Sequence, residues 1–482
     1  MIIYKNKLIF FKSVIILCWI TSLILFFNCP DNLDERYMSF SLINTFISTL
    51  AFFSYKKKVF QNNFYLSISS LFILSLIITH FQIPLLHVFG FNIETEFFIN
   101  FIWADTTIGN LSVAISSLAL ISFYTGHITK RKIKIVHLKT KNYHRITNVL
   151  TLLSIIFYFL FFVTSGSYMY GKYGVGDQLI VSNYFVLLFN LFLKSALILK
   201  MYTINYNIKN ISNLKEYILF IGFPITFLLA WHLLFSTFVG DRGPIIVYGL
   251  LYFGLYFLRI SRKTLIITLC VAVIFPVVFS IIGASRSRVS NESFNARISS
   301  SNYETRYAKY FNADMPGLST LELALSVRCL NHSIANVPKN YDYNFGLYQL
   351  KQILASVPFL VGIIENNFIN TSKNKESSSD FISYLIQGND ISYGDATTPV
   401  ADLYLDFGPI GVFLVFFLFG GIFKKADLII FSGSYTSLFS WIAIMFFWSG
   451  AIYLGRATFL YYLQSIIQIY LLIVILYSLL DK

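Results

Sequence analysis

Long apolar segments alternate with short polar ones along nearly the whole chain. A helix needs about 20 apolar residues to cross a bilayer, and about twelve segments meet this length. They lie near residues 8–27, 38–55, 64–84, 109–125, 147–166, 183–203, 217–238, 244–260, 264–284, 399–422, 432–452 and 457–479. The pattern therefore predicts an all-α polytopic membrane protein.

One polar stretch is much longer than the others and separates the ninth predicted span from the tenth. We expect the chain to have three parts. Residues 1–284 would hold helices 1–9, residues 285–398 would form a large periplasmic loop, and residues 399–482 would hold helices 10–12. The loop contains helix signals of its own, so we expect it to be partly helical.

Two short helices are expected in this loop. Ser319-Thr320-Leu321-Glu322 has the spacing of a capping box, and the helix that it opens would end at Val337-Pro338. At about 100° per residue, Glu322 points away from the face that carries Leu321, Leu325, Arg328 and His332. A second helix is expected from Leu347 to Ala355.

The composition agrees with a membrane protein. The chain has 482 residues, of which 56% are hydrophobic and 12% charged, and its mean hydropathy is +0.66. Soluble domains carry about 25% charged residues. The net charge of +14 comes from basic residues in alternate connecting segments, such as Lys56–Lys58 and residues 130–134. The positive-inside rule explains this placement, so we expect cytoplasmic termini and no nucleic-acid partner.

Several arginines occupy positions where a helix end is already positive. Arg242 lies in the turn Gly240-Asp241-Arg242-Gly243-Pro244, and Arg456 precedes the last predicted span. Helix N-termini attract anions, so an arginine there is disfavoured unless an anion is bound. Arg286 and Arg288 follow the ninth span, and Arg328 lies on the first loop helix. Because arginine binds phosphate oxygens in a bidentate manner, the set predicts a pyrophosphate site.

A plainer explanation for these arginines stays open. They would then bind the headgroups of membrane lipids, or pair with Asp241, Glu292 and Glu304. Each arginine taken alone favours this alternative. Their coincidence at the outer ends of several helices favours a substrate site.

The tenth predicted span begins with a strong helix signal. Thr398 is a good N-cap, and Pro399 suits the first helical position. Asp402 in the first turn complements the helix dipole. Asp406 lies one turn deeper, where an unpaired carboxylate is costly. The pair Gly408-Pro409 is expected to kink or break the helix.

Motifs for other chemistry are missing. The chain has no HExxH, CxxC or DxD sequence for a metal ion, and no GxGxxG or Walker sequence for a nucleotide. We therefore expect no metal and no cofactor. Phosphate chemistry would depend on arginine side chains.

Four short segments of the chain together resemble the O-antigen polysaccharide polymerase family (Wzy class). They are the turn Gly240–Pro244, Gly283-Ala284-Ser285-Arg286, the block from Asn344 to Pro358, and Ala401–Gly408. The family often has glutamate at the position of Asp402. The resemblance implies a polytopic glycosyltransferase of the bacterial inner membrane. Its substrates would be undecaprenyl-pyrophosphate-linked oligosaccharides, and its partners a chain-length regulator protein and a flippase.

The resemblance leads to specific roles for the residues. Arg242, Arg286, Arg288 and Arg456, with Arg328 as a further member, would hold the pyrophosphates of the two substrates. Glu322 or Asp402 would take the proton from the acceptor hydroxyl, with His332 as a third candidate.

Two other functions share this architecture. A flippase or other transporter of lipid-linked oligosaccharide would need polar groups along a path through many spans, whereas charge in the middle of the predicted spans is nearly confined to Lys194 and Asp406. An O-antigen ligase, which moves finished polysaccharide onto a lipid A core, is the other alternative.

Overall fold

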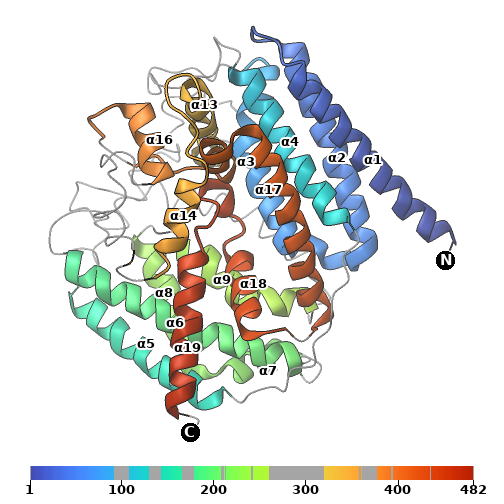
Figure 1. The fold of residues 1–482 in the computed structure, drawn as a ribbon. Helices are drawn as coiled ribbons and strands as arrows, with labels where there is room; N and C mark the ends of the chain where they lie inside the picture. Colours follow the sequence, from blue (N-terminus) through green and yellow to red (C-terminus); the bar gives the residue numbers. More distant parts are fainter. Residues whose placement is uncertain are drawn as a thin grey trace. The chain divides into compact units, whose positions relative to one another are not determined.

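The computed structural model of the protein consists of helices and connecting segments (Figure 1). It describes residues 2–91, 108–129, 143–164, 179–207, 213–239, 243–259, 320–357, 377–391, 394–434 and 436–480, together with residues 211, 241 and 360. No strand occurs in these ranges. Eight of the described helices are long and apolar enough to cross a membrane, or nine if one bent pair counts as a single span. For the described residues the all-α expectation is confirmed, whereas the number of twelve spans and the large periplasmic loop stay predictions.

The helices fall into two compact units. Unit 1 is made of Met1–Ile133, Tyr310–Leu428 and Ala451–Gln464, and unit 2 of Lys134–Lys309, Ile429–Gly450 and Ser465–Lys482. The long helices of unit 1 are α1 (Ile2–Phe27), α2 (Glu35–Phe60), α3 (Ile68–Val88), α4 (Ile108–Ile128) and α17 (Pro399–Ser432) as far as Leu428. Its short elements are η1 (Gln61–Leu66), α12 (Leu321–Ala324), α13 (Val327–Asn336), α14 (Leu347–Leu354), α16 (Ser378–Gln387) and η7 (Leu454–Arg456).

Small and hydroxyl-bearing residues bring the long helices of unit 1 together. Ser117 of α4 hydrogen-bonds with Thr45 of α2 at 2.8 Å, a contact that satisfies polar groups inside the bundle. A Cβ atom at Gly126 of α4 would overlap the carbonyl of Phe417, and one at Gly420 would overlap that of Phe123. The backbones of α4 and α17 are therefore in direct contact, which only glycine permits at these two positions.

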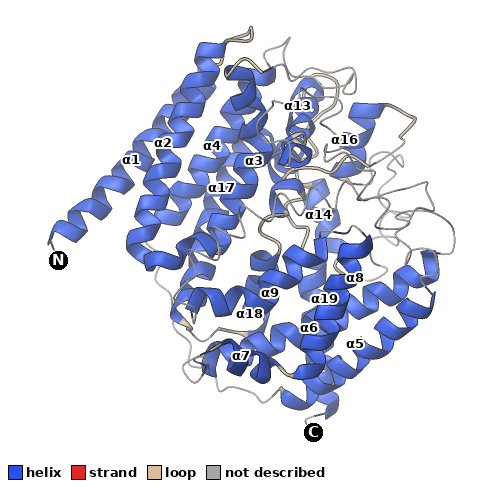
Figure 2. Cartoon of the chain, turned by 180° about the vertical axis from the view of Figure 1, so that it is seen from behind, coloured by secondary structure: helices blue, strands red, loops and turns tan. Residues whose placement is uncertain are grey.

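Unit 2 contains α5 (His144–Thr164), α6 (Leu179–Asn207), α7 (Leu214–Ile221), α8 (Phe223–Val239), α9 (Gly243–Arg259) and α18 (Leu438–Ser449), with most of α19 (Leu463–Leu480). Helices α5 and α6 pack along their length, as Figure 2 shows, and α9 contacts α6, α8 and α18. Gly254 of α9 lies directly against the indole of Trp448.

The seventh predicted span, residues 217–238, is not one straight helix. It is divided into α7 and α8, which meet at an angle of 99°. Pro224 has no N–H to offer the carbonyl of Phe220, and its ring would clash with that carbonyl in a continuous helix. Gly222 makes the bend with φ of 104°, and Lys200 Nζ lies 3.4 Å from the freed oxygen of Phe220.

The last predicted spans also differ from the helices in the structure. The segment predicted as 432–452 contains α18, which has only 12 residues. The final helix begins at Leu463, because residues 450–462 form turns and η7 before it. The eighth segment forms α9 with 17 residues. The ninth predicted span, 264–284, lies outside the described residues.

Candidate active site

A buried polar site forms in unit 1 around Asp402, in the first turn of α17. Its Oδ2 atom accepts hydrogen bonds from Gln349 Nε2 at 2.8 Å and from the backbone N–H of Phe459 at 2.7 Å. Gln352 Nε2 donates to the same oxygen at 3.4 Å, and Gln352 Oε1 accepts the N–H of Leu460 at 3.1 Å. The Asp402 side chain thereby connects α14, α17 and the segment 457–460.

The sequence places this carboxylate by ordinary helix-starting chemistry. The hydroxyl of Thr398 accepts the N–H of Ala401 at 3.1 Å, and Pro399 is the first residue of the helix. Both predictions for the helix start are confirmed. Asp402 is fully buried in the first turn, where the helix dipole favours a negative charge.

One oxygen of this carboxylate has no partner. Asp402 Oδ1 and Gln349 Oε1 are both buried and accept no hydrogen bond. A buried acceptor without a donor is costly, and such atoms are uncommon in folded proteins. The site therefore presents two acceptor atoms, and a hydroxyl group would satisfy either one of them.

Asp406, one turn further along α17, has a different environment. Its two carboxylate oxygens accept the N–H groups of Tyr348 at 3.2 Å and Gln349 at 3.0 Å. These are among the first residues of α14, whose early N–H groups have no partner within the helix. Asp406 thus caps α14, and burial, together with the charge of Asp406, raises the pKa of Tyr348.

The predicted kink is present at Gly408, which has φ of 63°. Pro409 has no N–H for the carbonyl of Leu405. That carbonyl instead accepts the N–H of Asn344 at 3.0 Å, and the carbonyl of Asp406 accepts that of Phe345 at 2.8 Å. The interrupted helix therefore provides the backbone acceptors that hold the segment leading into α14.

Arg328 of α13 pairs with a carboxylate of the protein. Its guanidinium contacts Asp395, whose other oxygen accepts Gln387 Nε2 at 2.7 Å. The amide of Asp395 donates to Ser383 Oγ at 2.8 Å. These contacts join α13, α16 and the residues that lead into α17. Arg328 therefore pairs with an acid of the protein, Asp395, and its role in binding pyrophosphate stays a prediction.

Two of the predicted arginines share one neighbour. Burial raises the pKa of the Cys329 thiol to about 12, while the positive charges of Arg328 and Arg456 act in the opposite direction. Both charges therefore act on the same thiol. Cys329 is a free cysteine, as is Cys29.

Arg456 does not open the last span, contrary to the prediction from sequence. It belongs to η7, and α19 begins only at Leu463. The preceding Gly455 donates its N–H to Ser75 Oγ of α3 at 3.2 Å, and a Cβ at Gly455 would overlap that side chain. The position of Arg456 is therefore set by close packing of η7 on α3.

The remaining site predictions are distributed as follows. Arg242, Arg286 and Arg288 lie outside the described residues, so the arginine cluster stays a prediction. Glu322 belongs to α12, and His332 is buried in α13. The expected single helix is two helices, and the Thr320 hydroxyl makes no cap. That hydroxyl donates to Gln82 Oε1 at 2.8 Å. Ser319, the N-cap of the predicted capping box, lies outside the described residues, so the box stays a prediction.

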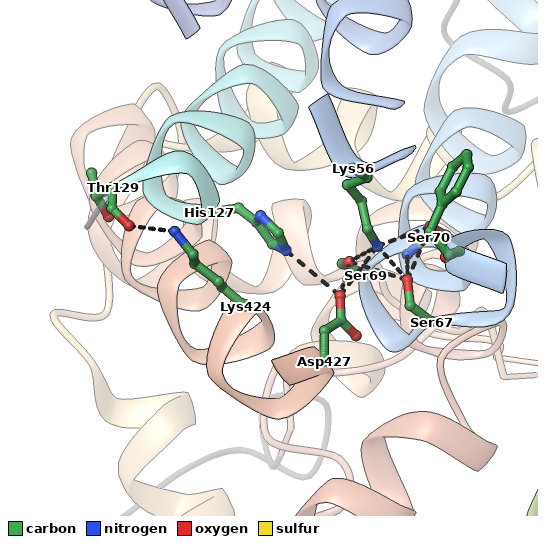
Figure 3. Close-up of polar contacts among 9 residues, drawn as sticks. Lys56, Ser67, Ser69, Ser70, His127, Thr129, Lys424 and Asp427 are labelled. Carbon is green, nitrogen blue, oxygen red and sulfur yellow. Dashed lines mark hydrogen bonds and ion pairs between the residues drawn. The ribbon is translucent and has the colours of Figure 1, made fainter. Parts of the chain in front are cut away.

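A second buried cluster was missed at the sequence level (Figure 3). Lys56 Nζ lies 3.1 Å from Asp427 Oδ2 and 3.0 Å from Ser70 Oγ, and it also contacts Ser67 and Ser69. His127 Nε2 lies 3.6 Å from the same carboxylate oxygen. In the sequence Lys56 is one of three consecutive lysines in a predicted connecting segment, and Asp427 lies in the connecting segment after the tenth predicted span, so no local signal pairs them.

These features define a polytopic helical membrane protein with a buried carboxylate site at the start of one long helix. In the described part of the chain, no group of three or more His, Cys, Asp or Glu side chains is arranged to hold a metal ion. The chain belongs to the O-antigen polysaccharide polymerase Wzy family, whose family model matches residues 8–481. No curated protein and no solved structure matches the chain.

Membership of this family indicates the activity of the protein. The protein is a glycosyltransferase-type polymerase that acts on lipid-linked oligosaccharide repeat units and is an integral membrane protein. Among the described residues, the site around Asp402 is the candidate for this chemistry.

Proposed function

We propose that this polymerase works on the periplasmic face of the bacterial inner membrane, with about twelve spans and both termini in the cytoplasm. It transfers the growing glycan from its undecaprenyl pyrophosphate onto an incoming lipid-linked repeat unit. The family match over residues 8–481 is the observation that carries this function. A chain-length regulator protein and a flippase are its expected partners in the membrane.

In the reaction, a hydroxyl oxygen of the incoming unit attacks the anomeric carbon of the growing chain. The bond from that carbon to the pyrophosphate oxygen breaks, and undecaprenyl pyrophosphate leaves with the bonding electrons. The proton of the attacking hydroxyl passes to a carboxylate. We assign this role to Asp402, because Oδ2 is held by Gln349 and Phe459 while Oδ1 lacks a donor. Glu322 is the second candidate.

The leaving group carries negative charge that must be stabilised. We assign this to Arg242, Arg286, Arg288 and Arg456, whose guanidinium groups suit phosphate oxygens. Catalysis by this set needs no metal ion. Arg328 then has a positioning role, because its ion pair with Asp395 fixes the residues that precede α17.

A strain that lacks the protein separates the candidate functions. Loss of a polymerase leaves surface lipid that carries a single repeat unit, whereas loss of a flippase leaves none. Loss of a ligase leaves long polymer on the carrier lipid. We expect the single-unit product, and either other outcome would overturn the assignment.

The arginine set is tested in the same strain by complementation. Arg242→Ala and Arg286→Ala should insert normally but produce no long polysaccharide. Arg36→Ala, at an exposed position of α2, is the matched control and should restore a normal ladder. Normal ladders from both arginine variants would remove these residues from the site.

A further inference from the structure

A segment without α-helix, residues 451–462, follows α18 and belongs to unit 1. It consists of turns and η7, and its internal backbone bonds are local. The N–H of Arg456 donates to the carbonyl of Tyr453 at 2.9 Å, and that of Tyr461 to the carbonyl of Thr458 at 3.2 Å. Irregular backbone inside a membrane protein needs partners from the surrounding protein. The side chains that bind this segment therefore decide where it lies.

Ser75 of α3 binds the first half of the segment. Its side chain is buried, and its hydroxyl donates to the carbonyl of Ile452 and accepts the N–H of Gly455 at 3.2 Å. Serine hydroxyls within helices often bond to a carbonyl one turn earlier in the same helix, as Ser154 does with Leu150 at 2.7 Å. Ser75 instead bonds twice to one turn of a distant segment. This turn is thereby fixed against α3.

The second half of the segment contacts the site around Asp402. The N–H of Phe459 donates to Asp402 Oδ2 at 2.7 Å, and that of Leu460 to Gln352 Oε1 at 3.1 Å. Gly455 and Phe459 are four residues apart, so their Cα atoms are separated by at most about 14 Å. A displacement of Gly455 is therefore passed along a short stretch of chain to a donor of Asp402.

We propose that Ser75 is a positioning residue for polymerisation, which acts on Asp402 by anchoring the segment 451–462 to α3. The proposal rests on the proposed function, in which Asp402 is the base. A base must lie within hydrogen-bond reach of the proton that it accepts, and small displacements of catalytic groups greatly lower the rate. A hydroxyl on a different helix thus contributes to the reaction through the backbone that it holds.

The test is polymerisation by the purified full-length protein in lipid vesicles, together with hydrogen exchange of the backbone amides of residues 455–460. Ser75→Ala removes the hydroxyl that binds the segment. Thr79→Val is the matched control, because it removes another buried hydroxyl of α3, one that has no hydrogen-bond partner. Thermal unfolding in detergent establishes that each variant is folded.

We expect Ser75→Ala to lower kcat about tenfold with little change in KM, because an interaction that matters in the transition state is weakened. The amides of residues 455–460 should exchange faster in this variant. Thr79→Val should change neither property. Unchanged kcat in Ser75→Ala would overturn the proposal.

A double variant distinguishes positioning from a general loss of folded protein. Ser75→Ala/Asp402→Asn should be at most about threefold slower than Asp402→Asn alone, because residues that act as a unit are not additive. A loss of folded protein would lower the rate by the same factor in both backgrounds. Full multiplication of the two losses would therefore overturn the proposal.

Hydrogen exchange separates failure of this proposal from failure of the proposed function, because it does not require polymerisation. If the deletion strain behaved as a flippase or ligase mutant and Ser75→Ala still exchanged faster, the anchor would stand and its role in polymerisation would fall. If the strain behaved as a polymerase mutant and Ser75→Ala polymerised at the natural rate, the proposed function would stand and the role of Ser75 would fall.

Discussion

Asp402 and Asp406 show how two identical residues on one helix acquire different roles. Both are fully buried. Asp406 has each carboxylate oxygen bound to a backbone N–H of α14, so it is committed to holding that helix. Asp402 has three donors on one oxygen and none on the other. Only Asp402 keeps an acceptor atom available for chemistry.

Gln349 is predicted to act through Asp402. Replacing it by leucine removes the donor to Asp402 Oδ2, so the carboxylate is held less firmly, and we expect polymerisation to fall about tenfold. The double variant Gln349→Leu/Asp402→Asn should then be no slower than Asp402→Asn alone, because residues that act as a unit are not additive. If the rate losses of the two single variants multiplied in the double variant, Gln349 would have a role separate from that of Asp402.

Cys329 is predicted to resist thiol reagents. Burial raises its pKa to about 12, so the reactive thiolate is scarce at neutral pH. In a Cys18→Ser/Cys29→Ser/Cys270→Ser variant, we expect maleimide to label the folded protein very slowly and the unfolded protein at once. Because the folded pKa is above that of a free thiol, labelling should keep rising beyond pH 9. A plateau near pH 9 would contradict the burial.

At the scale of elements, the junction between α14 and α17 depends on two features of α17. Asp406 caps α14, and Gly408 allows the kink that frees the carbonyls of Leu405 and Asp406. A Cβ at Gly408 would lie 3.0 Å from the Tyr343 ring, at a φ that side-chain-bearing residues avoid. The geometry of Asp402 therefore depends on an interruption in its own helix.

Asp406→Ala is predicted to loosen this junction. It leaves two N–H groups of α14 without partners, and we expect a loss of about 1 to 3 kcal/mol in stability. The thermal unfolding temperature in detergent should fall, and limited proteolysis should begin at residues 343–357. Asp406→Asn keeps acceptor capacity and should lose less. Equal stability of the alanine variant and the natural protein would show that the cap is unimportant.

The sequence predicts individual helices better than it predicts how they meet. Periodicity and length identify α1 to α6 and α17, because a run of about 20 consecutive apolar residues is enough to predict a membrane span. The bend at Gly222-Phe223-Pro224 was missed because the segment is apolar throughout. Within the site, Thr398, Asp402 and Gly408 carry local signals. Gln349 and Phe459 carry none, since each meets Asp402 across more than 50 residues of chain.

At the scale of the whole molecule, the cluster around Asp427 joins segments from widely separated parts of the chain. Lys56 comes from α2, Ser67, Ser69 and Ser70 from the start of α3, and His127 from α4, while Asp427 lies on α17 (Figure 3). Nearby, Lys424 Nζ donates to the carbonyl of Thr129 at 2.6 Å. Four long helices of unit 1, α2, α3, α4 and α17, therefore meet at one buried ionic contact.

Asp427→Asn is predicted to destabilise the protein strongly. It leaves the Lys56 ammonium buried without its counter-ion, and breaking such a pair typically costs about 3 to 5 kcal/mol. We expect low yield of folded protein and a lower unfolding temperature. The double variant Lys56→Met/Asp427→Asn removes the stranded charge and should recover most of that loss. Failure of the double variant to recover would show that the carboxylate contributes more than charge balance.

The most direct test of the account is polymerisation by purified protein in lipid vesicles with a lipid-linked repeat unit as the only substrate. We expect the natural protein to form longer glycans and to release one undecaprenyl pyrophosphate for each bond made. Asp402→Asn keeps the hydrogen bonds of the site but cannot accept a proton, so its rate should fall about 100-fold or more. Glycan growth at the natural rate by Asp402→Asn would contradict the assignment of Asp402 as the base.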